Sequence, residues 1–170
     1  MLAFVSVPDQ GYGDRLLARV AKRLVATGID VGGVIQLNTE TEPDCPCLMD
    51  LQVLSDDSVV RISQSLGRHS SGCRLDAAGL EEAVGRVGSA LRAATPQLLI
   101  LNKFGKQETE GRGFRPLIGQ ALSLGVPILT SVSAKNQDGF DIFAAGMATR
   151  LDATEIAITA WCLSHATARV

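Results

Sequence analysis

Aromatic side chains are scarce in this chain of 170 residues, at 4% of all residues. A surface that stacks nucleic-acid bases needs several exposed aromatic side chains beside positive charge. The chain has little of either, since its formal net charge is -2. The composition therefore argues against a nucleic-acid partner and predicts a core built from aliphatic residues.

Long apolar runs are also missing. The run at 98–101 is typical of those present, whereas a membrane-spanning helix needs about 18 consecutive apolar residues or more. The N-terminal residues show neither a basic leader nor a small-residue cleavage site. These features predict a cytoplasmic protein without membrane insertion. The 46% hydrophobic content suffices for one sizeable core, and we expect residues 1–170 to form a single domain.

The four cysteines are better interpreted as reduced thiols than as a disulfide framework, because no export signal accompanies them. Cys162 lies in an apolar helical pattern and is expected in the core. Cys45, Cys47 and Cys73 could form a zinc set with His69, but their spacings differ from the usual C-x2-C knuckles. A redox-active pair and a soft-metal site stay open beside ordinary thiols, and we expect no bound metal.

Hydrophobic periodicity predicts alternating strands and helices. Asp14 and Asp76 stand where helix N-caps are expected, and Asp152 with Glu155 has capping-box spacing. The order indicates a three-layer α/β domain with a mostly parallel sheet and an inserted β-hairpin. The expected strands are 2–7, 31–37, 47–54, 59–64, 97–101 and 126–132. The first expected helix lies between Gly13 and Gly28, and the others cover 77–93, 114–124, 138–150 and 153–167.

Ligands of open parallel sheets bind beyond the carboxyl ends of the strands. The loops 8–14 and 102–113 hold most of the glycines and bases of that rim. The first has the strand–turn–helix order of a phosphate-binding loop, in which backbone N–H groups face an anion. We expect the strand ending at Asn102 to lie beside the strand ending at Val7, so that these loops face each other.

The phosphate-loop pattern is altered at the positions that carry its chemistry. Asp14 stands where the pattern has a lysine, and Arg15 stands where it has the hydroxyl that holds Mg²⁺. The apolar strand at 98–101 ends in Asn102 and Lys103 instead of a metal-orienting acid. Efficient hydrolysis of a nucleoside triphosphate is therefore not expected.

The segments NKFGK, at 102–106, and GCRLD, at 72–76, carry a family resemblance, together with Phe114 and the strand start VPIL. The chain resembles small phosphate-loop nucleoside-triphosphatases over roughly residues 3–147. It is closer still to an uncharacterised bacterial family that is related to them and is often encoded near molybdate transport genes. The resemblance implies a phosphate-loop-type fold and a role in molybdenum handling.

We expect a binding or regulatory protein whose small anionic ligand is a nucleotide or an oxyanion such as molybdate, phosphate or sulfate. Two alternatives stay open. One is an active nucleoside-triphosphatase or nucleotide-transferring enzyme that uses Lys103 or Lys106 as its catalytic cation. The other is a structural protein that binds a protein partner through the acidic region 40–57. The expected anion-site residues are Gly11, Gly13, Asp14, Arg15, Asn102, Lys103, Lys106 and Arg112.

Overall fold

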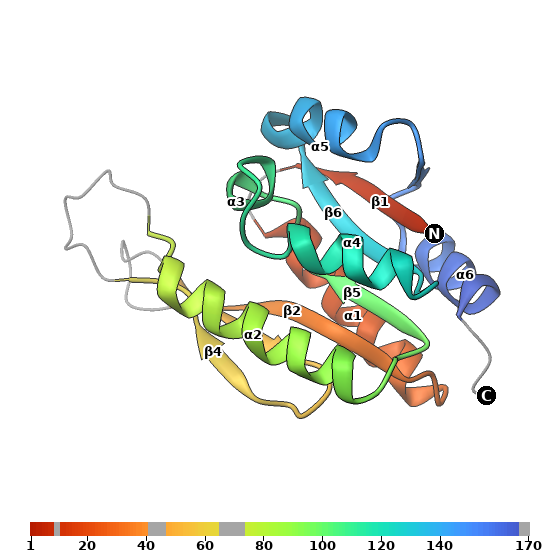
Figure 1. The fold of residues 1–170 in the computed structure, drawn as a ribbon, viewed down its shortest axis with the longest axis horizontal. Helices are drawn as coiled ribbons and strands as arrows, with labels where there is room; N and C mark the ends of the chain where they lie inside the picture. Colours follow the sequence, from red (N-terminus) through yellow and green to blue (C-terminus); the bar gives the residue numbers. More distant parts are fainter. Residues whose placement is uncertain (9–10, 41–46, 65–73, 167–170) are drawn as a thin grey trace.

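The computed structural model describes residues 1–8, 11–40, 47–64 and 74–166, and its centre is a sheet in the order β4-β3-β2-β5-β6-β1-β7 (Figure 1). β1, β2, β5, β6 and β7 pair in parallel, while β3 and β4 form the expected antiparallel hairpin beside β2. The strands are β1 (Leu2–Val7), β2 (Val31–Thr39), β3 (Leu48–Val53), β4 (Val59–Arg61), β5 (Leu98–Leu101), β6 (Ile128–Ser133) and β7 (Ala148–Leu151).

Helices cover both faces of the sheet, as Figure 1 shows with α2 and α4 in front and α1 behind. One apolar core joins the front of the sheet to α2, α4 and α5. A second core joins the back of the sheet to α1 and α6. The helices are α1 (Tyr12–Ala26), α2 (Ala77–Ala93), α3 (Lys106–Thr109), α4 (Arg115–Ser123), α5 (Gln137–Ala144) and α6 (Glu155–His165), with the 3-10 turn η1 (Ala134–Asn136) before α5.

β5 shows why an apolar strand belongs at the centre. Leu99 and Leu101 pack into the front core, while Leu98 and Ile100 pack into the back core, so both faces of the strand are covered. Cys162 of α6 is fully buried in the back core, and burial raises the pKa of its thiol to about 12. This cysteine therefore packs as a small apolar residue, as predicted.

The C-terminal region differs from the prediction of a helix over 138–150. α5 ends at Ala144 because Ala145 and Gly146 have left-handed backbone angles, with φ of +47° and +77°. Residues Ala148–Leu151 then form β7, which pairs in parallel with β1. α6 begins after Thr154, whose side chain accepts from the Ala157 N–H, so the predicted capping box of Asp152 and Glu155 is wrong.

The strand order also corrects one expectation about the rim. β6 lies between β5 and β1, so the strands that end at Leu101 and Val7 are not neighbours. Leu129 of β6 is in register with Ala3 of β1 and with Ile100 of β5. All three strands run in parallel, so their carboxyl ends still meet at one rim of the sheet.

No helix in the described ranges is long and apolar enough to cross a bilayer.

Candidate anion-binding site

The turn between β1 and α1 brings backbone close to the end of β6. Gly11 has a left-handed φ of +76° and is the N-cap of α1. A Cβ at Gly13 would lie 3.0 Å from Val7 Cγ2 and 3.2 Å from Ser131 Oγ. The absence of a side chain at Gly13 therefore lets the first turn of α1 sit directly on the strand ends.

Asp14 is buried in that first turn, with 4% of its surface exposed. Its Oδ1 accepts from Asn102 Nδ2 at 2.6 Å and lies 3.2 Å from Lys103 Nζ. Its Oδ2 accepts from Asn38 Nδ2 at 2.8 Å. The prediction of Asp14 as the N-cap of α1 is wrong, because Gly11 holds that position and the Asp14 carboxylate faces the strand ends instead. Two amides and one ammonium group compensate this buried charge.

Asn102 joins three strands to α1. Its side-chain Oδ1 accepts from the buried Gln36 N–H of β2 at 3.1 Å, while its Nδ2 donates to Asp14. Its backbone carbonyl accepts from Ser131 Oγ of β6 at 2.6 Å. The sequence analysis did not identify Gln36, Asn38 or Ser131. Gln36 and Asn38 alternate with Leu37 in the second half of β2. This pattern was the available signal for Gln36 and Asn38, because polar residues that end a parallel strand lie at the ligand rim.

The acid and the lysine of this network differ in position from those of the phosphate-loop pattern. The pattern places a lysine on the helix turn and an acid after the neighbouring apolar strand. Here the acid, Asp14, is on the helix turn, and the lysine, Lys103, follows β5. The Asp14 carboxylate already binds Asn38, Asn102 and Lys103.

A small cavity of about 110 Å³ lies beside this network. Gly11 and Gly13 contribute backbone to its wall, and its described lining holds two lysines, Lys103 and Lys135, and one acid, Asp14. Lys135 belongs to η1 after β6 and was not among the expected site residues. The volume of this cavity is several times the roughly 30 Å³ that one water molecule occupies in the liquid. This size suits one tetrahedral oxyanion.

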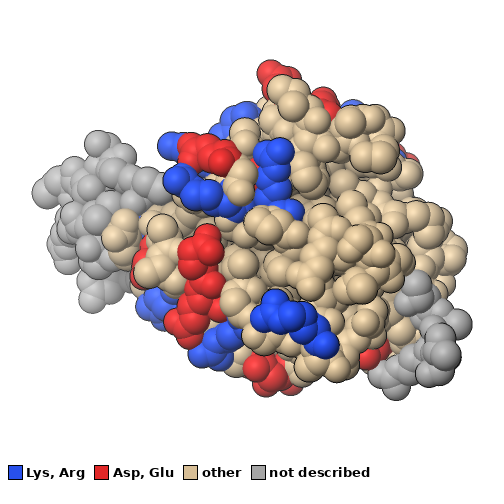
Figure 2. All heavy atoms as spheres, in the orientation of Figure 1, with Lys and Arg blue, Asp and Glu red and all other residues tan. Residues whose placement is uncertain are grey.

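The expected anion-site residues separate into two groups. Gly11, Gly13, Asp14, Asn102 and Lys103 come together at the rim, and Arg15 Nη1 lies 3.4 Å from where a Cβ on Gly11 would be. Lys106 is instead the first residue of α3 and Arg112 follows that helix, and both pair with Glu110. Figure 2 shows Lys and Arg side chains gathered over this part of the molecule, with acidic atoms between them. Neither Lys106 nor Arg112 lines the small cavity.

A buried acid fixes the loop that carries α3. Glu108 is 4% exposed, and its Oε2 and Oε1 accept from the backbone N–H groups of Gly105 and Phe114 at 2.8 Å and 3.0 Å. Burial raises the pKa of the Glu108 carboxyl, and the two N–H donors offset this shift only in part. Glu108 therefore connects the start of the loop, next to Lys103, to the start of α4.

The raised pKa of Glu108 predicts a pH dependence of stability. Between the ordinary value of 4.5 and the raised folded value, the folded chain binds more protons than the unfolded chain. The contribution of Glu108 to the free energy of unfolding therefore falls as the pH rises through that window. We expect the free energy of unfolding of the wild type, minus that of Glu108→Gln, to decrease across this window in urea titrations. A difference that stays constant or increases would contradict this assignment.

The expected zinc set is only partly within the described residues. Cys45, His69 and Cys73 lie outside them. Cys47 is an exposed free cysteine whose carbonyl accepts from Arg74 Nη2 at 2.8 Å. The part of the chain that the structure describes holds no group of three or more His, Cys, Asp or Glu residues that could bind a metal ion.

The fold is similar to that of THEP1 from the hyperthermophile Aquifex aeolicus. The TM-score is 0.58, and the match covers 90% of this chain and 89% of THEP1 at 15% sequence identity. This likeness concerns the fold, and it confirms the predicted α/β architecture with a mostly parallel sheet.

Sequence comparison adds a relative and a family. The chain is 38% identical over 148 residues to the protein named Molybdenum import ATP-binding protein ModC 2 of Bradyrhizobium diazoefficiens. That match covers 87% of this chain and 16% of the relative, so the chain spans about a sixth of the relative's length. The model of the family described as "Protein of unknown function (DUF2478)" matches residues 2–161, and the chain belongs to this family.

Proposed function

We propose that this protein binds a small tetrahedral oxyanion in the cavity of about 110 Å³ and does not hydrolyse nucleotides efficiently. The observation that carries the proposal is the exchange of charges at the rim, in which buried Asp14 pairs with Lys103 and Asn102. An anion bound there would lie against the backbone of Gly11 and Gly13, at the start of α1, and beside Lys103 and Lys135, with Lys103 shared between the anion and Asp14. Charge-assisted hydrogen bonds of this kind contribute about 1.5–3 kcal/mol each.

The same exchange argues against metal-assisted hydrolysis. Mg²⁺ is held at phosphate sites by carboxylate and hydroxyl oxygens together with the phosphates themselves. Asp14 is engaged by three side chains, and Asn102 supplies a neutral amide where the pattern has an acid. A nucleotide could therefore place a phosphate in the cavity, but Asn102 stands at the position of the acid that would hold its metal ion.

The molybdenum part of the proposal comes from the relative. The matching protein is named for molybdenum import and ATP binding, and molybdate is a tetrahedral dianion of the same class as sulfate and phosphate. We propose that this chain serves molybdenum handling in an accessory or regulatory role, in the cytoplasm. Its similarity to about a sixth of the relative is consistent with a separate binding module.

A thermal-shift comparison tests the proposal. Molybdate, sulfate, phosphate and Mg-ATP are added in excess to the wild type, to Lys103→Met and to Lys22→Met. Lys22 is an exposed lysine of α1 outside the cavity and serves as the control. An oxyanion at about 100 times its Kd adds about 2.7 kcal/mol to the free energy of unfolding, which corresponds to roughly 5–10 °C for a chain of this size.

We expect at least one oxyanion to raise the Tm of the wild type and of Lys22→Met by that amount, each relative to its own ligand-free value. We expect little or no rise for Lys103→Met, because this variant loses a cation of the cavity. Equal shifts in all three proteins would place the anion elsewhere, and no shift with any oxyanion would contradict the proposed function.

A further inference from the structure

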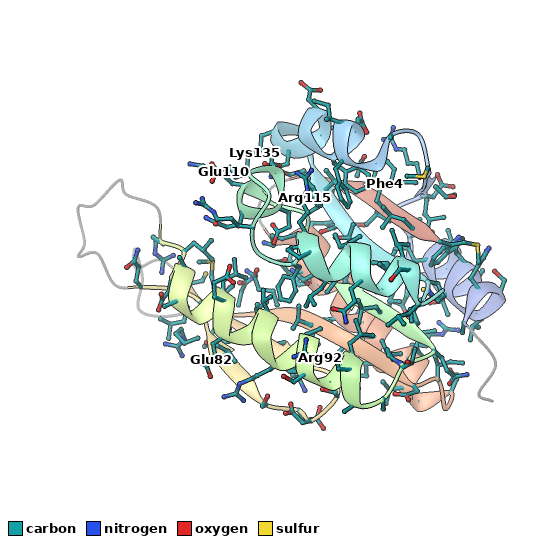
Figure 3. All side chains as sticks on the ribbon, viewed as in Figure 1. Phe4, Glu82, Arg92, Glu110, Arg115 and Lys135 are labelled. Atoms are coloured by element: carbon teal, nitrogen blue, oxygen red, sulfur yellow. The ribbon has the colours of Figure 1, made fainter. Side chains whose placement is uncertain are left out.

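A second cavity of about 320 Å³ adjoins the first, and Lys103, Lys135 and Asn136 line both. It lies between the β3–β4 hairpin, the start of α2 and the loop of α3. In Figure 3, Lys135 lies near Glu110, the residue that follows α3, in the part of the molecule opposite Glu82 of α2. Most of the wall of the second cavity is apolar and comes from Met49, Leu51, Ile62, Leu80 and Phe114.

The charged residues of this second cavity are mostly cations. Lys106, Arg74, Lys103 and Lys135 belong to its lining, and Glu108 is the single acid among the described lining residues. Lys103 also pairs with Asp14, and Lys106 also pairs with Glu110. Both oxygens of Glu108 accept backbone N–H groups, so its charge is already partly compensated. An apolar chamber with a cationic edge binds a molecule that has an apolar body and an anionic end.

The two cavities differ in what they can hold. Among the described residues, the smaller one is lined by the glycines of the β1–α1 turn, one acid and two lysines, around a volume that suits a single oxyanion. The larger one is at the lower end of the roughly 300–1,000 Å³ range of small-molecule sites, and a cavity of about 150 Å³ is enough to hold benzene. A bare oxyanion would leave the apolar walls of the larger cavity in contact with water.

We propose that the ligand is an organic phosphate monoester with an apolar body of one or two rings. Its phosphate lies in the smaller cavity, and its body lies against Leu51, Leu80 and Phe114 in the larger one. Lys103 and Lys135 stand at the junction and contact the phosphate from the shared wall. This inference rests on the proposed function, because it assigns a body to the oxyanion that the rim binds.

Titration calorimetry with inorganic phosphate and with phenyl phosphate tests this inference. We expect the wild type to bind phenyl phosphate about tenfold more tightly than inorganic phosphate, or better, because burial of the ring removes apolar surface from water. Met49→Phe fills part of the larger cavity from a half-buried strand position. Met147→Phe makes the same exchange at a residue that is 75% exposed and lines neither cavity, and it is the matched control.

We expect Met49→Phe to bind inorganic phosphate as the wild type does and to lose most of the preference for phenyl phosphate, while Met147→Phe keeps both. Equal affinity of the wild type for the two probes would overturn the inference and leave the proposed function standing. A preference that survives in Met49→Phe would also overturn it, because the ring would then lie elsewhere. Failure of both probes to bind would contradict the proposed function as well.

Discussion

Asn102→Ala is expected to lower the free energy of unfolding by about 3–5 kcal/mol, because it leaves two buried groups without their partner. Asn102 is 2% exposed, accepts from the Gln36 N–H and donates to the carboxylate of Asp14. A methyl group replaces neither interaction, and Asp14 would keep its charge with fewer donors. Such a loss is a large part of the 5–15 kcal/mol that typically separates folded from unfolded domains.

Asn38→Ala is the matched control for this prediction. Asn38 is an exposed amide that donates to the other oxygen of the same carboxylate at 2.8 Å. Because water can replace it, we expect a loss of about 1 kcal/mol or less. Urea denaturation of both variants measures the difference. Equal losses in the two variants would show that burial of Asn102 is not what makes it important.

Gly113→Ala is expected to cost about 2–4 kcal/mol, because a side chain there meets both backbone strain and a collision. Gly113 has a φ of +58°, and a Cβ on it would lie 2.2 Å from Oε1 of Glu108. That oxygen accepts from the Phe114 N–H, so it cannot move away without breaking a buried hydrogen bond. We expect the midpoint of urea denaturation to fall accordingly.

Gly111→Ala separates the collision from the strain. Gly111 lies in the same loop with a φ of +88°, and a Cβ on it would meet nothing within 4 Å. The change should cost about 1–2 kcal/mol, the usual penalty of a left-handed backbone for a residue with a side chain. A loss at Gly111 as large as that at Gly113 would mean that contact with Glu108 adds nothing.

The strands and helices followed from apolar patterns wherever those patterns were long. The apolar pattern of α1 is confirmed by the burial of Leu16, Leu17, Val20, Ala21 and Leu24, while Val25 at its end is 53% exposed. Asp76 caps α2 as predicted. β7 was missed because it has four residues and is half-exposed at the sheet edge, so its sequence carries little period-two signal. The position of β6 between β5 and β1 could not be predicted either, because it depends on contacts between segments that are distant in the sequence.

The candidate site was only partly predictable for a related reason. Loop positions placed Asp14, Asn102 and Lys103 at one rim, and the structure joins them by hydrogen bonds and an ion pair. The same reasoning added Lys106 and Arg112, which pair locally with Glu110 instead. Spacing along the chain shows where charges gather, but the choice among competing partners depends on side-chain distances that only the folded chain defines.

The most direct test of the exchanged-charge rim is release of phosphate from ATP by the purified protein with Mg²⁺. Because Asp14 and Asn102 differ from the lysine and the metal-orienting acid of the phosphate-loop pattern, we expect no multiple turnover above the buffer blank. Magnesium-dependent multiple turnovers that persist through purification and are lost in Asp14→Asn would contradict the account and identify the protein as an enzyme.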